Sequence, residues 1–520
     1  MLAKLPPSRQ LAPIDLVAPG FRGLNFSQSG SVLSPQYATK ATNCTLDSAG
    51  RLAARDGITN LTSTPISGTP TVRTLFEHYR ADGTTDLISA YAGGISNAVA
   101  NPAANDISGT VDDANGRWWF QNFNDKCIGF QAGKTPIVRT GGTFATVVAT
   151  SGSVPTGEVA CAAFGRIWQA NAEGTVLYYS GLLDETRWLA EDAGAGTIDM
   201  RNVWTQGTDT ITAIWAFNGA LVVFGNNHIV FWVDGRGSKL GIDPTNLYVS
   251  DVIAGTGCVS QYTIQAVGET DLLFLSPSGV QSIKRLLTEK SSPISSLSKY
   301  VRDEMLYQFR SETLTNIRST YNPLYGFYLL SFPTTGVVWV LDQRRRYRDE
   351  DGDEVSIVTQ WSLSLTAVAS TKARTIYAAR TAGKIGQYIG DTDEGSTFRF
   401  IYQSPWLDLG EQLADRLKML KRLGAILFVR SNTTVVFKWS ADFDEATASM
   451  QRTVATGGAA SEWNIAEFGL AEWNGGLSLR ILKVPARGRA QYFRIGIEAD
   501  INGEFAVQQA ELFTKIGRLA

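Results

Sequence analysis

The sequence has few charged residues and no marked excess of either sign. Asp, Glu, Lys and Arg make up 18% of the 520 residues, and the formal net charge at pH 7 is −2. Soluble domains usually carry about a quarter charged residues. Tight binding of nucleic acid through counterion release needs a concentrated positive surface. The composition therefore excludes a strongly basic domain that grips DNA, and any DNA partner is held only weakly.

Residues that form metal and nucleophilic sites are scarce. There are two histidines, His78 and His228, and four cysteines, which lie far apart and form no CxxC pair. The cysteines are Cys44, Cys127, Cys161 and Cys258. No HExxH, no GxSxG and no zinc-spaced Cys/His set is present. We therefore expect buried free thiols made in a reducing cytosol, turn or core histidines, and no catalytic residue, metal or cofactor.

Long apolar runs are also missing. The first residues, MLAKLPPSRQLAPIDLVAP, lack the 7–15-residue apolar core of a signal peptide. No run reaches the roughly 18 apolar residues of a membrane span. We expect a soluble protein that is assembled in the cytoplasm, is not exported by the usual route and does not insert into membranes.

What the sequence does contain is glycine and aromatic residues arranged as repeated hairpins. It has 50 Gly and 24 Phe, a composition typical of all-β proteins, where glycine serves turns and aromatics suit pleated faces. Six times an apolar strand, a tight polar turn and a second apolar strand follow one another. The turns fall at Asn124, Ala172–Gly174, Asn226–Asn227, Pro277–Gly279, Thr334–Gly336 and Ala382–Gly383.

The spacing of these turns, roughly 50 residues, is the period of β-propeller blades. Each interval has room for two further strands, and a weaker hairpin, DLISAYAGGISNAVA, precedes the six. The pattern predicts a propeller of six or seven blades over residues 60–395. A string of separate β-sandwich domains is the alternative, and even spacing without Pro-rich linkers favours the propeller.

Two flanking regions complete the predicted organisation. Residues 1–59 form an extended arm and a first hairpin, and residues 396–520 read as alternating strands of a C-terminal β-sandwich-like domain. One helix is predicted in SPISSLSKYVRDEMLYQF, residues 292–309, between two blades. The overall prediction is an all-β chain.

The densest charge run, RRRYRDEDGDE, spans residues 344–354. It predicts a long solvated loop. Its Gly352 comes too early for a calcium-binding loop, which has glycine at the sixth position. It is also the candidate channel or gate loop. Its candidate residues are Arg344, Arg345, Arg346, Arg348, Asp349, Asp351 and Asp353.

The stretch NCTLDSAGRLAARDGIT, residues 43–59, together with the preceding APGFRGLNFSQSG, resembles a known family. Tail nozzle and packaged-DNA-stabilisation proteins (tail tubular or stopper proteins) of short-tailed bacteriophages open with an asparagine-containing strand, a D-x-x-G turn and an arginine-bearing strand ending in a glycine turn. The matching residues here are Asn43, Asp47, Gly50, Arg55 and Gly57.

Further segments continue this resemblance over about residues 15–410. They are FGRIWQANAEGTVLYYSGLLDETRW, ALVVFGNNHIVFWV, GTGCVSQYTIQAVGETDLLFLSPSGVQSI and SPWLDLG. Their order and spacing carry the resemblance, since no single motif is distinctive. The charge run at residues 344–354 has no counterpart in the family.

The resemblance implies a structural virion protein of the tail. The family implies a homohexameric ring docked on portal or tail adaptor proteins, with tail fibres or tailspikes as further neighbours and genomic double-stranded DNA passing through the channel. A near-neutral chain suits such a conduit, because a strongly basic bore would hold the genome.

Two other functions remain open from the sequence. A glycan-binding or glycan-cleaving propeller at the tail tip would bring carboxylates and aromatic rings together on one face. The SxDxGxTW turns of sialidase-type propellers are not found. A kelch-like adaptor would show Gly-Gly and Trp signatures in each blade, and these are missing as well.

Overall fold

A computed structural model provides the structure, and it describes most of the chain between residues 9 and 519. The residues outside the description are 1–8, 100–107, 110, 114, 191–193, 206, 237–241, 269, 290–295, 381, 410–415, 445–449, 458–477 and 520. Among the described residues, no helix has the length and apolar character needed to cross a membrane.

The chain divides into two compact units, which we call the propeller unit and the sandwich unit. The propeller unit comprises Asn60–Val338 and Leu363–Gln387. The sandwich unit comprises Met1–Thr59, Trp339–Ser362 and Tyr388–Ala520. The three consecutive domains predicted from sequence are therefore replaced by two interleaved units, because strands distant in the chain share the same sheets.

The propeller unit is a succession of small antiparallel sheets. Within the described residues there are seven groups of strands, the blades: six are separate sheets, and the sixth in chain order is the first two strands of a nine-stranded sheet. They are β8 (Val72–Tyr79), β9 (Thr85–Tyr91) and β10 (Gly94–Asn97); β11 (Trp119–Phe123), β12 (Lys126–Phe130), β13 (Ile137–Thr140) and β14 (Thr143–Thr146); β15 (Ala160–Ala163), β16 (Arg166–Ala170), β17 (Val176–Tyr179) and β18 (Gly196–Asp199); β19 (Ala213–Phe217), β20 (Ala220–Phe224), β21 (His228–Asp234) and β22 (Leu247–Ala254); β23 (Gln265–Val267), β24 (Asp271–Ser276) and β25 (Gly279–Ser282); β26 (Arg318–Asn322) and β27 (Phe327–Phe332); and β30 (Ala367–Ser370), β31 (Ile376–Ala379) and β32 (Ile385–Tyr388) with β7 (Ile58–Asn60).

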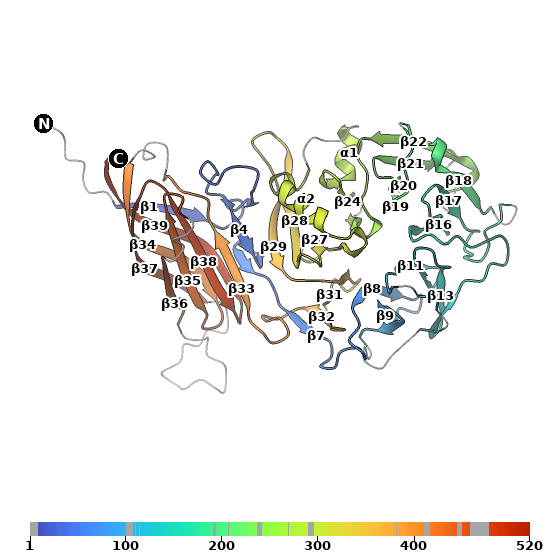
Figure 1. Ribbon diagram of the computed structural model, residues 1–520, viewed down its shortest axis with the longest axis horizontal. Helices are drawn as coiled ribbons and strands as arrows, with labels where there is room; N and C mark the ends of the chain where they lie inside the picture. Colours follow the sequence, from blue (N-terminus) through green and yellow to red (C-terminus); the bar gives the residue numbers. More distant parts are fainter. Residues whose placement is uncertain are drawn as a thin grey trace. The chain divides into compact units, whose positions relative to one another are not determined.

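The sheets follow one another around an axis, as the sequence colours in Figure 1 show from β8 through β18 to β31. The first strands touch in the order β8, β11, β15 and β19, and again in the order β23, β26, β30 and β8. Between β19 and β23, the Gln261 side chain exchanges hydrogen bonds with the backbone of Ile214. This arrangement is a β-propeller with seven described blades and confirms the predicted fold class.

The last sheet is closed by the segment that enters the propeller. The Leu61 N–H donates to the Ile385 carbonyl at 3.0 Å, and the Ile66 N–H donates to the Gly383 carbonyl at 3.1 Å. Because the first and last segments share one sheet, the succession of blades has no open end, and only short outer strands remain as edges. Closure of this kind removes an unpaired strand that would otherwise promote aggregation.

The six predicted hairpins all form. The turn of β11–β12 is an example: Asn124 and Asp125 have φ of 46° and 62°. Two consecutive left-handed residues define the type I′ turn, whose twist matches that of the flanking strands, and Asn and Asp tolerate this conformation best. The local sequence therefore specifies the hairpins that build the sheets.

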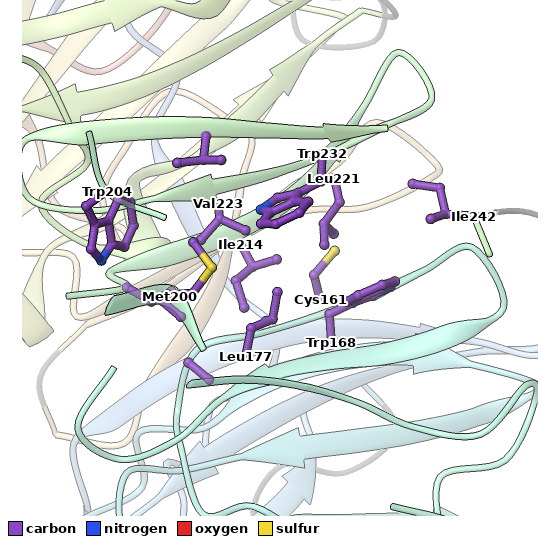
Figure 2. Packing of buried hydrophobic residues seen from close by; sticks show 13 residues of the cluster. Cys161, Trp168, Leu177, Met200, Trp204, Ile214, Leu221, Val223, Trp232 and Ile242 are labelled. Carbon is purple, nitrogen blue, oxygen red and sulfur yellow. The ribbon is translucent and has the colours of Figure 1, made fainter. Parts of the chain in front are cut away.

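Neighbouring sheets are joined by hydrophobic clusters. Figure 2 shows one of them, in which Trp168 and Leu177 of one sheet pack against Ile214, Leu221 and Val223 of the next. All five side chains are fully or almost fully buried. Burial of a Leu, Ile or Val side chain stabilises by about 1.5–3 kcal/mol, so these interfaces hold the propeller together.

The sandwich unit contains two large sheets. One has the order β37 (Ser478–Ala490), β34 (Arg416–Val429), β39 (Phe505–Leu519), β6 (Leu52–Ala54) and β5 (Cys44–Leu46), with β1 (Arg9–Asp15) also paired to β39. The other continues the sheet that β26 and β27 begin, in the order β28 (Val337–Arg348), β29 (Glu354–Ser362), β4 (Lys40–Thr42), β33 (Phe398–Gln403), β38 (Phe493–Ile501), β35 (Thr434–Ala441) and β36 (Gln451–Ala455). A short parallel pair, β2 (Gly23–Leu24) and β3 (Tyr37–Ala38), lies beside them in the same unit.

The two sheets pack face to face. Phe400 of β33 meets Phe505 of β39 edge-on, with ring centroids 5.1 Å apart. The Trp439 indole of β35 donates to the Arg487 carbonyl of β37 at 2.9 Å. The C-terminal β-sandwich is thus present, but strands from residues 9–59 and 339–362 complete it.

Two α-helices accompany the strands. Helix α2 (Arg302–Ser311), preceded by the 3-10 turn η4 (Lys299–Val301), overlaps the second half of the predicted helix and ends two residues beyond it. Val301 and Met305, two of the predicted apolar positions, are fully buried. The predicted first residues, 292–295, lie outside the described residues. Helix α1 (Ile283–Glu289) was not predicted: it follows β25 directly, and its N-cap is Ser282, whose hydroxyl accepts from the Arg285 N–H at 3.3 Å.

Candidate functional site

A cavity of about 420 Å³ lies on the axis of the propeller unit. Its walls come from the first strand of every one of the seven described blades, from β8 through β30, and from η3 (Gln261–Thr263). Because the first strands of a propeller surround its axis, residues far apart in sequence meet there. Small-molecule sites occupy cavities of about 300–1,000 Å³, so this one is large enough to hold a ligand.

Aromatic rings form one wall of the cavity. The Trp119 ring lies 5.4 Å from Tyr262 and 6.3 Å from Trp215, measured between centroids. The Trp119 indole donates to the Ala160 carbonyl at 2.8 Å, which fixes its orientation. Burial, and then the nearby Glu158 carboxylate, raise the pKa of Tyr262 far above its usual value. The phenol is therefore neutral and available as a hydrogen-bond donor.

Three arginines gather beside these rings. The Arg318 guanidinium lies 4.0 Å from the Tyr262 ring centroid and donates to the backbone carbonyls of Arg73, Thr315 and Ile317. Arg73 and Arg117 both donate to the side-chain oxygen of Asn316, at 3.2 and 2.9 Å.

The arginine cluster, defined as Arg73, Arg117 and Arg318, concentrates positive charge. Burial, followed by the charge of Arg117, lowers the pKa of Arg73. Burial also lowers the pKa of Arg318, despite the opposing influence of Tyr262 and Glu158. In the part of the chain that the structure describes, none of the three forms an ion pair. Such a cluster suits an anionic partner, since guanidinium groups match carboxylate and phosphate geometry.

No motif in the sequence points to this site. Arg73, Arg117 and Arg318 lie on different blades and share no motif. The only available clue was position, since each lies at or just before the first strand of its sheet. That clue becomes usable only when the blades and their order are known.

The arginine-rich run lies elsewhere, in the sandwich unit, and its predicted loop is corrected by the structure. Arg344, Arg345, Arg346 and Arg348 lie in β28, and β29 resumes at Glu354. Only residues 349–353, including Asp349, Asp351 and Asp353, form the connection. The apolar residues upstream, which include Val and Trp, start the strand, and the long side chains of the run continue it. The run is therefore one arm of a hairpin that ends in a tight acidic turn.

Two of these arginines hold the hairpin onto the opening stretch. Arg345 donates to the Asp47 carbonyl at 2.6 Å and to the Asp342 carboxylate at 3.2 Å. Arg344 donates through its backbone to the buried Asp342 side chain and through its guanidinium to the Leu46 carbonyl. These side chains are therefore structural contacts within the unit. Arg348 is exposed.

The acidic turn brings three carboxylates together. Oxygens of Asp349, Asp351 and Asp353 lie within 4.8 Å of one another. The turn is explained by Asp349, whose side chain accepts the N–H groups of Asp351 and Asp353 at 3.0 and 2.8 Å. Exposed acidic turns of this kind are common in proteins without a bound ion, so the geometry alone assigns no metal.

The residues of the opening stretch have structural contacts inside the sandwich unit. The fully buried Arg55 side chain forms two hydrogen bonds to the Asp393 carboxylate, at 2.9 and 2.5 Å, and a third to the Asn43 amide oxygen at 3.0 Å. Asn43, at φ 55°, also accepts from the Ser362 N–H and donates to the Arg399 carbonyl.

The glycines of the same stretch allow close packing. A Cβ on Gly57 would lie 2.1 Å from the Thr392 carbonyl oxygen, so any other residue would displace the backbone. Gly50 has φ +82° in the turn between β5 and β6, a conformation that favours glycine. These contacts make the stretch a determinant of the fold of the sandwich unit.

The cysteines and histidines occupy the core. All four thiols are buried and free, and burial raises the pKa of Cys161 and of Cys258 to about 12. His78 and His228 are almost fully buried, with His228 bonded to Asp209 at 2.9 Å. The predicted buried thiols are confirmed, and the histidines are turn and core residues.

Comparison with known proteins gives only distant similarity. No protein-family model and no curated protein matches the sequence. Among solved structures, the extracellular domain of a one-component system from B. thetaiotaomicron aligns with 12% identity over 85% of this chain, with a TM-score of 0.39. PorZ, a surface component of the type-IX secretion system of Porphyromonas gingivalis, aligns with 11% identity over 66% of this chain, with a TM-score of 0.36. This chain spans 62% and 42% of those two chains.

Proposed function

We propose that this chain is a structural virion protein, one subunit of a ring-shaped tail nozzle of a short-tailed bacteriophage. In this role it retains the packaged genome and provides its path during ejection. Its partners are further copies of itself, portal or tail adaptor proteins, and the DNA that passes through the ring. The proposal assigns no catalytic step to the chain.

The observation that carries the proposal is how the fold uses the residues that resemble the nozzle family. Asn43, Arg55 and Gly57 have their contacts inside the sandwich unit, where they join the opening stretch to Asp393 and Thr392. These residues determine a fold and take no part in a reaction. A resemblance carried by such residues supports a shared architecture. A structural subunit of a ring acts through its architecture, so this resemblance supports the proposed role.

Charge and symmetry agree with this proposal. A closed ring uses heterologous contacts, in which one face of a subunit meets a different face of the next. The formal net charge of −2 suits a conduit. A surface without excess positive charge releases few counterions from DNA, so it binds the DNA only weakly and lets it pass. Within the ring, we place the gate at the tip of the hairpin, at Arg346, Arg348 and the acidic turn, since Arg344 and Arg345 hold the hairpin in place.

Electron microscopy of the purified protein and of isolated tails tests the proposal. We expect six-fold class averages with a central opening wide enough for a duplex, and the hairpin tip of residues 346–353 at that opening. A protein that stays monomeric at all concentrations and is missing from tails would overturn the nozzle function. Rings whose opening lies far from the hairpin would overturn the gate assignment alone.

A second function is favoured by one specific observation, the axial cavity. Aromatic rings, Arg318 and Glu77 line it, and Arg73, Arg117 and Glu158 lie close to Arg318, a combination that suits a glycan-binding propeller. The cavity lies in the propeller unit and needs no ring for its formation. A ligand site at the tail tip is also compatible with a role in the virion, so the two functions do not exclude each other.

A further inference from the structure

We infer that the axial cavity of the propeller unit binds an acidic sugar, with the arginine cluster receiving its carboxylate. The inference gives a ligand class to the second function above and does not depend on the nozzle proposal. It rests on three features: the arginine cluster, of which Arg318 lines the cavity while Arg73 and Arg117 lie close to Arg318, the aromatic wall of the cavity, and its hydrogen-bonding side chains.

The charge of the site calls for an anion. Arg73 and Arg117 converge on the single neutral side chain of Asn316, and Arg318 lies over Tyr262. Three guanidiniums held this close repel one another, and burial strengthens that repulsion. A bound carboxylate would relieve it and accept the charge-assisted hydrogen bonds that Arg forms best.

One polar group of the arginine cluster lacks a partner. Nε of Arg117 is buried and forms no hydrogen bond, whereas the buried Tyr262 hydroxyl has the Glu158 carboxylate beside it. An anionic ligand seated beside the cluster would accept a hydrogen bond from Arg117 Nε.

The rest of the cavity fits a sugar better than a small inorganic anion. Trp119, Trp215 and Phe76 provide apolar surfaces, while Gln121, Gln265 and Thr320 provide hydrogen-bonding groups. A pyranose ring presents apolar C–H faces and a polar hydroxyl edge, which match this division. Inorganic phosphate would leave the aromatic wall unused.

Glu158 sharpens the selectivity of the site. Its carboxylate is close enough to raise the pKa of Tyr262. Two carboxylates, Glu158 and the cavity-lining Glu77, stand against three guanidiniums, which leaves one excess positive charge that attracts a singly charged ligand. Glu158 accepts hydrogen bonds from sugar hydroxyls, and it disfavours a doubly charged phosphate.

Isothermal titration calorimetry of the full chain tests the inference. The acidic sugars are methyl β-glucuronide, galacturonide and N-acetylneuraminide, and the comparison ligands are methyl β-glucoside and inorganic phosphate. We expect an acidic sugar to bind, with the neutral glucoside at least about tenfold weaker, since a hydrogen bond to a charged group is worth about 1.5–3 kcal/mol. Tryptophan fluorescence should change on binding, because Trp119 and Trp215 line the cavity.

Arg73→Gln and Arg117→Gln should each weaken binding of the acidic sugar by about tenfold or more and should have little effect on binding of the glucoside. Arg318 is left intact, because it bonds three backbone carbonyls and its loss would disturb folding. The matched control is Arg201→Gln, an arginine of the same unit whose side chain is 62% exposed; it should bind as the unaltered protein does.

Three results would overturn the inference. The first is no binding of any acidic sugar at millimolar concentration while the protein remains folded by circular dichroism. The second is equal affinity for glucuronide and glucoside, which removes the role of the arginines. The third is phosphate binding at least as tight as the sugar acids. Failure of this experiment leaves the ring test untouched, because the ring is read by microscopy.

Discussion

At the scale of single residues, buried polar groups in the propeller unit are matched to their neighbours. His78 is 2% exposed, and its Nδ1 lies 2.7 Å from the Asn122 amide oxygen. Burial lowers the pKa of His78, and Arg80 and Arg139 add to the effect, while Asn122 and Asp86 oppose it. The imidazole is therefore neutral in the folded protein at pH 7.

This residue predicts a pH dependence of stability. With a lowered folded-state pKa, the unfolded chain binds more protons below pH 6.5, so the free energy of unfolding falls as the pH drops through that value. One proton accounts for at most about 1.4 kcal/mol per pH unit. Urea unfolding at pH 7.5, 6.5 and 5.5 should show this loss, and His78→Gln should reduce its slope. Identical slopes in the two proteins would contradict the assignment.

At the scale of secondary-structure elements, the ion pair of Arg55 and Asp393 joins the opening stretch to the C-terminal part of the sandwich unit. The Arg55 side chain is 0% exposed and stacks 3.9 Å from the Phe398 ring centroid. Its contacts reach Asn43 on one side and Asp393 on the other. A single side chain thus ties segments more than 300 residues apart in sequence.

Removing this arginine should be costly. Arg55→Leu leaves the Asp393 carboxylate without its partner, and loss of one member of a buried pair costs about 3–5 kcal/mol. The double variant with Asp393→Asn should recover part of that loss, because the uncompensated charge is removed. Urea unfolding measures both.

The control for this measurement is Arg399→Leu in the same unit. Arg399 is 42% exposed and paired with Glu498 and Asp500, so its loss should cost no more than about 1 kcal/mol. Equal costs for Arg55→Leu and Arg399→Leu would show that burial of the Arg55 pair contributes nothing.

At the scale of the whole molecule, the order of segments in the chain differs from their order in the sheets. Strand β33 pairs with β38 on one side and with β4 on the other. Strand β39 pairs with β6, β1 and β34. Residues 9–59 are therefore interior parts of the sandwich unit.

This arrangement predicts that residues 396–520 do not fold by themselves. Without β4, β5, β6 and the β28–β29 hairpin, the long strands have uncovered edges and an incomplete core, which favours aggregation. Expressed alone, this segment should show no cooperative thermal unfolding by circular dichroism, whereas the full chain should. Supplying residues 1–59 by co-expression should raise its soluble yield. A well-folded, monomeric segment would refute the interleaved unit.

Local features were predictable because they depend on near neighbours in the chain. The Asn124–Asp125 and Asn226–Asn227 turns follow from residue types that accept positive φ or favour hairpin turns. The apolar residues on either side of them follow from the burial of the strands. The Arg344–Arg348 run was mistaken for a loop because charge suggests exposure. Its side chains are satisfied by Asp342 and by backbone carbonyls that only the folded unit brings near.

The sequence by itself determined the all-β class, the hairpin period and the buried state of the cysteines. These follow from composition and from turn chemistry, which act over a few residues. The tertiary structure alone decided that there are seven described blades, that the terminal segments share one sandwich, and that Arg73, Arg117 and Arg318 come together at the wall of the axial cavity. The physical reason is that closure of a ring and pairing of distant strands depend on the packing of whole sheets, which no short stretch of sequence specifies.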